Sequence, residues 1–235
     1  MRIESPRPKP RFFLPEKALL VHTKPDVELL RKALGLEKKG TLFLAGLWAS
    51  ERLSLCGPVL GAPQAALVLE NLKAAGVRKV LALGWAGTIR KDLPLGGIFL
   101  PEEALSAEGT SAHYGLFPRP SEALFWWVYH ELVALGLNFE TGKVVSTDAP
   151  YREDEAFWAR FPGASVVDME TSAIFSVGEA LGLEVASLLV ISDRLGERHE
   201  RAPSSLIEET VSALLPLFRN FGVDFPGLAK RSATD

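Results

Sequence analysis

Residues 165–175 read SVVDMETSAIF, and this stretch decides the fold and the site. An apolar, β-branched run ends at Asp168, and a helix-forming segment begins after Glu170. An acid in the first helical turn complements the helix dipole, which explains Glu170. It does not explain Asp168, because an unpaired charge at the end of a buried strand is costly. We therefore expect the two carboxylates to hold a polyhydroxylated ligand, since each can accept hydrogen bonds from two neighbouring hydroxyls.

The same alternation of strand and helix continues on both sides of this junction. The pattern predicts strands over 17–23, 77–84, 96–101, 142–148, 166–169 and 184–192, with a strand pair at 43–48 and 52–57. It predicts helices over 62–76, 121–136, 171–182 and 204–218, the last with Ser205 and Glu208 as a capping box. Such alternation is typical of a layered α/β fold with a parallel or mixed sheet. We expect one domain over 1–235, with 1–14 as an extended arm.

The composition excludes several classes of protein. The net charge is −3, without the basic excess of a general nucleic-acid binder. The single Cys56 cannot form an internal disulfide, which fits a reducing compartment. The sequence contains neither a membrane-spanning run of roughly 20 apolar residues nor the apolar core of a signal peptide. The expectation is a cytoplasmic protein that binds neither membrane nor nucleic acid.

Ligands of α/β proteins collect beyond the carboxyl ends of strands, so the segments after each strand are candidate sites. GPVLGAP (57–63) places Gly61 before a helix, where backbone N–H groups favour an anion, although a simple tight turn fits equally. GWAGTIR (84–90) is expected to be a turn, with Gly87 allowing close approach. Trp85 is either a pocket wall or part of the core.

Two further strand ends carry chemistry. STDAPYRED (146–154) offers Tyr151 for stacking on a heterocycle and Arg152 as a guanidinium, or it is a solvated loop. LLVISDRLGER (188–198) delivers Asp193 at the end of an apolar strand, where a carboxyl group can act as a general acid. Its structural alternative is an Asx turn or helix cap.

Taken in order, these segments resemble the nucleoside phosphorylase and nucleosidase superfamily, which includes purine nucleoside and uridine phosphorylases, methylthioadenosine/adenosylhomocysteine nucleosidases and AMP nucleosidases. The resemblance runs from about 17 to 218, and VVDMETSAIF followed by LLVISD carries most of it. AEGTSAHY (107–114) and TDAPYRE (147–153) add to it. It implies three αβα layers around a twisted mixed sheet partly closed into a barrel, and cleavage of a nucleoside's N-glycosidic bond.

The resemblance also implies roles for individual residues. Met169 would pack under the ribose and Glu170 would bind its 2′- and 3′-hydroxyls, with Asp168 in place of a more usual Glu. Tyr151 falls near the base-stacking aromatic, and Asp193 matches the acid that acts on purine N7. No metal or organic cofactor is expected; phosphate would be the co-substrate of a phosphorylase.

The sequence departs from the phosphorylase pattern at the phosphate site. HTKPDV (22–27) replaces a Gly-Asp-Pro-x-x-Arg-like segment, and Ala82 replaces an arginine. Trp85 and Gln64 replace hydroxyl residues. Gly61 and Arg90 are the expected phosphate contacts that remain, unless Lys24 or another subunit supplies the charge.

Three functions stay open from these observations. The leading expectation is phosphorolysis of a purine nucleoside. The alternatives are a hydrolytic purine nucleosidase of the methylthioadenosine or AMP type, and a non-catalytic nucleoside-binding homologue. A homo-oligomer (dimer, trimer or hexamer) is also expected, with the proline-rich arm and FWWVY (125–129) as candidate contacts; core packing is the alternative for the latter. The histidines His22 and His113 receive no role.

Overall fold

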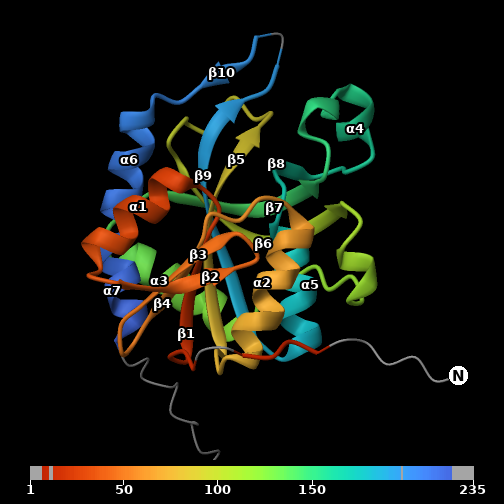
Figure 1. The fold of residues 1–235 in the computed structure, drawn as a ribbon. Helices are drawn as coiled ribbons and strands as arrows, with labels where there is room; N and C mark the ends of the chain where they lie inside the picture. Colours follow the sequence, from red (N-terminus) through yellow and green to blue (C-terminus); the bar gives the residue numbers. More distant parts are fainter. Residues whose placement is uncertain (1–6, 11–12, 197, 224–235) are drawn as a thin grey trace, which may run out of the picture.

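The computed structural model describes residues 7–10, 13–196 and 198–223, and within them the strands form one mixed sheet (Figure 1). Its strands are β1 (Lys17–Val21), β2 (Glu37–Leu42), β3 (Ala45–Ala49), β4 (Ser54–Gly57), β5 (Lys79–Thr88), β6 (Ile98–Ala107), β7 (Phe139–Thr147), β8 (Ala164–Asp168), β9 (Glu184–Arg194) and β10 (Glu200–Arg201).

The strand order closes part of this sheet on itself. The order is β10-β9-β6-β7-β8-β5-β1-β4-β3-β2, and β9 also pairs with β5. Strands β9, β6, β7, β8 and β5 therefore form a closed ring, from which β1, β4, β3 and β2 extend. This confirms the expected mixed sheet partly closed into a barrel. Because β1 and β9 both run parallel to β5, their carboxyl ends meet at one edge.

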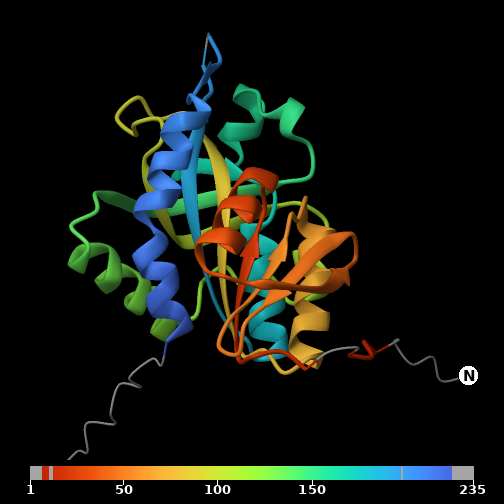
Figure 2. The ribbon, with the colours of Figure 1, turned by 60° about the vertical axis from the view of Figure 1, so that its left-hand side comes forward.

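Helices cover both faces of the sheet (Figures 1 and 2). Helices α2 (Ala62–Ala74) and α5 (Thr171–Leu181) lie on one face, where Leu69 and Ile174 share a buried cluster with Leu20 and Ala82. The other face carries α1 (Lys24–Ala33), α3 (Glu122–Ala134), α6 (Ser204–Ala213) and α7 (Leu215–Gly222). A short helix, α4 (Glu155–Ala159), and two 3₁₀ turns at Ser111–His113 and Pro150–Arg152 lie between strands.

The structure corrects several boundaries. Residues 84–88 continue strand β5 and are not a turn, because they pair with both β8 and β9. The predicted helix over 204–218 is two helices; Pro216 lies near the start of α7 and cannot donate a backbone hydrogen bond. The capping box was wrong: α6 begins at Ser204 after Pro203, with no side-chain cap. Strand β2 and helices α1 and α4 were not predicted.

The aromatic segment of α3 divides between core and surface. Phe125 and Val128 are buried, and Trp127 packs on Phe221 with ring centroids 5.6 Å apart. Trp126 is 46% exposed. Of the predicted arm, residues 1–6 and 11–12 lie outside the described residues. No helix in the described part of the chain is both long enough and apolar enough to cross a membrane.

Candidate active site

The candidate site is arranged along the last residues of β5. Gly84 lies against His22, which follows β1 and still pairs with β5 by donating its backbone N–H to Leu83. Gly87 lies against Asp193: a Cβ at residue 87 would stand 3.2 Å from Asp193 Oδ2. The two glycines are therefore strand residues whose missing side chains make room for an imidazole and a carboxylate.

The segment after β8 runs back along β5 between these two points. Val167 pairs with Gly87 in the antiparallel β5–β8 register. Asp168, Met169 and Glu170 follow, and Glu170 ends beside His22: its Oε2 lies 3.3 Å from His22 Nδ1. Asp168 and Glu170 are each 5% exposed and Met169 is half-buried, so the quoted junction is enclosed at the edge of the sheet.

Glu170 reaches across to another helix. Its Oε1 accepts the backbone N–H of Gly61, 2.5 Å away at the N-terminus of α2. Burial would raise the pKa of Glu170, but His22 and the Gly61 N–H outweigh burial and lower it. Burial would likewise lower the pKa of His22, yet the negative charges of nearby carboxylates, Glu170 first, raise it. The two groups form a buried ion pair at a helix N-terminus.

The side chain of Asp168, and not that of Glu170, makes the hydrogen bonds at the start of α5. Its Oδ2 accepts hydrogen bonds from the backbone N–H of Thr171 (3.0 Å) and from its hydroxyl (2.5 Å), and Oδ1 accepts from Ser146 Oγ (2.5 Å). Asp168 therefore caps α5, and Glu170 does not. Burial, together with the charge of Glu170, raises the pKa of Asp168 to about 6.

The two motifs at the ends of β6 and β7 meet beside this cap. Glu108 accepts hydrogen bonds from the N–H groups of Thr110 and Ser111 and from Ser172 Oγ, on α5, 3.0 Å away. The Gly109 N–H donates to Asp148 Oδ2 at 3.0 Å. The segments 107–114 and 147–153 are thus brought together at the N-terminus of α5.

Asp193 lies at the end of β9 with two described hydrogen-bond partners. Ser192 Oγ donates to Oδ1 at 2.6 Å, and His199 Nε2 lies 2.9 Å from Oδ2. Burial and the charge of Asp193 raise the pKa of Glu153 to about 7, which places a second carboxyl group near this one. Sequence reasoning missed both His22 and Glu153; the acid-rich run YRED was the available signal for Glu153.

Among the described residues, no hydrogen bond or ion pair joins the remaining predicted residues, Tyr151, Arg152, Arg90 and Trp85, to Asp168, Glu170 or Asp193. Tyr151 is 98% exposed and Arg152 is also exposed, so stacking on a base and contact with substrate stay predictions. Arg90 makes a two-pronged ion pair with Asp92, through Nε and Nη2. Trp85 Nε1 donates to Asp26 Oδ2 at 2.8 Å.

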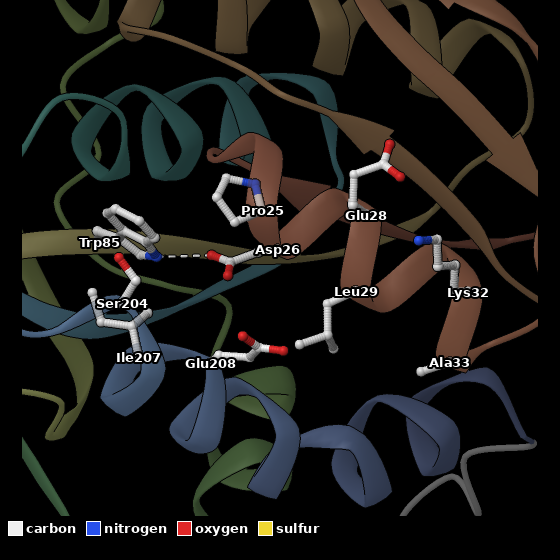
Figure 3. Close-up of a pocket in the computed structure, with 10 residues that line it drawn as sticks. All are labelled: Pro25, Asp26, Glu28, Leu29, Lys32, Ala33, Trp85, Ser204, Ile207 and Glu208. Atoms are coloured by element: carbon white, nitrogen blue, oxygen red, sulfur yellow. Dashed lines mark hydrogen bonds between the residues drawn. The ribbon is translucent and has the colours of Figure 1, made fainter.

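A cavity of about 650 Å³ lies between α1 and α6 (Figure 3). Trp85 and Asp26 line it, joined by their hydrogen bond, together with Pro25, Glu28, Leu29, Lys32, Ala33, Ser204, Ile207 and Glu208. Asp168, Glu170 and Asp193 do not line it. Trp85 therefore lines a cavity and also packs against the core, and this cavity does not hold these acids.

One set of donor atoms is compact enough for a cation. His22, Asp168 and Glu170 offer ligand atoms within 4.8 Å of one another. Hydrogen bonds from Ser146, Thr171 and Gly61 already engage both oxygens of Asp168 and one of Glu170. The ion pair and these hydrogen bonds account for the cluster by themselves, so the donor set does not call for a metal ion.

Comparison with known proteins shows the family to which this chain belongs. The model of the phosphorylase superfamily matches residues 16–221. A DeoD-type purine nucleoside phosphorylase of Clostridium perfringens is 30% identical over 170 residues, 68% of this chain and 71% of the relative.

Solved structures agree with this assignment. The AMP nucleosidase of Bacteroides thetaiotaomicron is 25% identical, with a TM-score of 0.73 over 88% of this chain and 90% of that one. The purine nucleoside phosphorylase of Toxoplasma gondii is 14% identical and shares the fold, with a TM-score of 0.81 over 94% and 97%. Because the family model matches nearly the whole chain, the chain belongs to the phosphorylase superfamily. It is an enzyme of the nucleoside phosphorylase and nucleosidase type, which cleaves N-glycosidic bonds.

Proposed function

We propose that this enzyme cleaves the N-glycosidic bond of a purine nucleoside and transfers the sugar to water. The observation that carries the choice of water is the carboxylate of Glu170 on the Gly61 N–H. The N-terminus of α2 is the kind of position that binds an anion, and the Glu170 carboxylate already occupies it.

The charges around this point also disfavour phosphate. Asp26, Asp168 and Glu170 are all buried. For each of them, the positive charge that lowers the pKa, and so favours the ionised form, comes from His22. Arg90, which the sequence predicted to bind phosphate, is paired with Asp92. Among the described residues, the ion-pair partner of Glu170 is a histidine and not a guanidinium, so a dianion placed here would meet carboxylates without the two-pronged contact that an arginine offers.

The substrate groups follow the row of side chains along β5. Glu170 has lone pairs left after its contacts with Gly61 and His22, so it can accept the ribose hydroxyls, with Met169 beneath the sugar. Asp193, beside Gly87, would protonate the leaving purine, and Tyr151 and Arg152 would close over the base from their exposed loop. Protonation is needed because the bonding electrons flow into the base as the sugar becomes cationic.

Phosphorolysis is the second candidate, favoured by the relatives named as purine nucleoside phosphorylases. It would need a cation from outside the described site, such as one supplied by a neighbouring subunit. For either acceptor we propose that the enzyme is a homo-oligomer, with the exposed Trp126 on α3 as a candidate contact between subunits.

One assay separates the two acceptors. Base release is measured from inosine, adenosine, uridine, methylthioadenosine and AMP, in phosphate-free buffer and with phosphate added, and the sugar product is identified. Hydrolysis predicts the free sugar (ribose from the nucleosides, methylthioribose from methylthioadenosine, ribose 5-phosphate from AMP) at a rate that phosphate does not change. A strict requirement for phosphate, with the 1-phosphate of that sugar as product, would overturn the choice of water. Failure to turn over any substrate would favour a binding protein.

A further inference from the structure

The His22 imidazole carries a buried nitrogen without a protein partner. Its side chain is 5% exposed, and Nε2 has no hydrogen-bond partner among the described residues. Nδ1 is 3.3 Å from Glu170 Oε2, an ion-pair contact that is not aligned as a hydrogen bond. Leaving a buried polar group unpaired costs about 1–3 kcal/mol. An imidazole kept in this state indicates that a ligand or water completes it.

Carboxylates face this ring from three elements. Glu170 lies at the start of α5, Asp168 at the end of β8 and Asp26 in the first turn of α1, and the charge of each raises the pKa of His22. Burial opposes them but does not prevail. The ring is therefore a stronger base than a free histidine, oriented on one side by Glu170. An acid that orients a histidine whose other nitrogen faces the reactant is a recurring catalytic arrangement.

The position of His22 relative to Asp193 suits attack by water. The glycines beneath the two side chains, Gly84 and Gly87, are three residues apart on β5, which is roughly 10 Å along a strand. The register between β5 and β9 shifts between Ala86 and Gly87, and such bulges re-aim side chains near active sites. The segment Asp168–Glu170 lies between the two ends.

This spacing of the two glycines is similar to the separation of an acid and a base that act on opposite sides of a sugar. In glycoside cleavage by direct water attack, the acid and the base stand about 6.5–9.5 Å apart so that a water fits opposite the leaving group. A ribose held by Glu170 would present C1′ between Asp193 on the leaving base and His22 on the opposite side.

We infer that His22 is a catalytic residue, the general base that activates the acceptor water through Nε2. Nε2 takes one proton of the water, and the water oxygen forms the new bond to C1′. The C1′–N bond breaks, its electron pair stays on the purine, and Asp193 protonates the purine. His22 then releases its proton to solvent and Asp193 regains one, so the products are free base and ribose. This inference rests on the proposed hydrolytic function.

The test compares His22→Gln with His130→Gln in the full chain, on the best purine substrate and without phosphate. His130 is exposed on α3, so its variant should retain wild-type kinetics. His22→Gln should lose about 10²- to 10⁴-fold in kcat, the usual share of a general base, with KM changed only a few-fold. The wild-type rate should rise with pH through an apparent pKa above 6.5, and this limb should vanish in the variant.

A second variant guards against loss of the fold. His22→Asn keeps an amide N–H near the position of Nδ1 and supplies no base, and thermal unfolding and nucleoside binding report whether each variant is intact. A folded variant that binds substrate and keeps the wild-type kcat and pH limb would overturn the role of His22 while leaving hydrolysis in place. Base release that requires phosphate would instead overturn the hydrolytic function and this inference with it.

Discussion

Gly84 lies so close to His22 that a Cβ at residue 84 would stand 2.2 Å from Nδ1 of the imidazole. No real side chain tolerates that distance, so the ring occupies the space that any other residue at position 84 would fill. The glycine is therefore a condition for the ion pair between His22 and Glu170, and not a device for turning the chain.

Replacing Gly84 with alanine should displace the imidazole and break its contact with Glu170. We expect the free energy of unfolding to fall by about 1–3 kcal/mol, the usual cost of overpacking, and base release to slow sharply. Gly109→Ala is the control for stability, since the nearest atom to its added Cβ is 3.8 Å away. Urea unfolding and initial rates measure both effects; an unchanged rate in a folded Gly84→Ala enzyme would contradict the placement of His22 in the site.

Asp193→Asn should remove the acid that assists departure of the base. The loss in kcat should reach about 10²- to 10⁴-fold for a purine nucleoside, because an amide N–H is far too weak an acid to transfer its proton to the leaving nitrogen. A 4-nitrophenyl riboside, whose leaving group departs unprotonated, should lose far less. Asp92→Asn removes an exposed carboxylate paired with Arg90 and serves as the matched control. Equal losses on both substrates would exclude Asp193 as the acid.

Trp85→Phe tests the hydrogen bond from Trp85 to Asp26, in the region where the sequence predicted phosphate. Asp26 is 2% exposed, and its Oδ2 accepts hydrogen bonds from Trp85 Nε1 and Thr23 Oγ1. Losing one donor should cost about 1–3 kcal/mol of stability.

The cost of this change should depend on pH. Burial already raises the pKa of Asp26, and a lost donor raises it further, so the destabilisation should be larger at pH 8, where the carboxylate is ionised, than at pH 4. Trp126→Phe on the exposed side of α3 controls for the loss of an indole. Equal losses at both pH values would mean that packing, and not the hydrogen bond, dominates.

The sequence predicted the strands and helices around the site because apolar spacing carries that information. The run 184–192 became β9 and 171–182 became α5, within two residues at each end. The glycines of β5 were misread, since glycine serves both tight turns and strands that another group approaches closely. Only the contacts of Gly84 with His22 and of Gly87 with Asp193 decide between the two readings.

The roles of the two acids in the quoted stretch could not be divided from sequence. Asp168 and Glu170 both stand within three residues of the first helical N–H groups, and either could cap α5. In the structure Asp168 caps α5, because the side chain of Glu170 is hydrogen-bonded to the backbone N–H of Gly61, 109 residues earlier in the chain. A lone histidine such as His22 shows no periodicity that would mark it, and its importance depends on the same distant contacts.

Glu153→Gln should flatten the dependence of stability on pH between about 4.5 and 7. Burial and the charge of Asp193 raise the pKa of Glu153 to about 7 in the folded protein, against 4.5 for an unperturbed glutamate. The folded state therefore binds this proton more tightly than the unfolded state does. Its contribution is fully present below pH 4.5 and is lost as the pH rises through 7. The glutamine variant cannot lose a proton. Between pH 5 and pH 8 its free energy of unfolding should therefore fall less than that of the wild type.

Glu155→Gln, a change at an exposed position on α4, is the matched control and should follow the wild-type curve of unfolding free energy against pH. The sign is the decisive feature. If Glu153 instead made a favourable ion pair, its pKa would be depressed and the substitution would cost stability at pH 8. Combining Glu153→Gln with Asp193→Asn tests the cause: because the charge of Asp193 helps raise the pKa, the two changes should not be additive. Additivity would assign the whole shift to burial and remove Glu153 from the neighbourhood of Asp193.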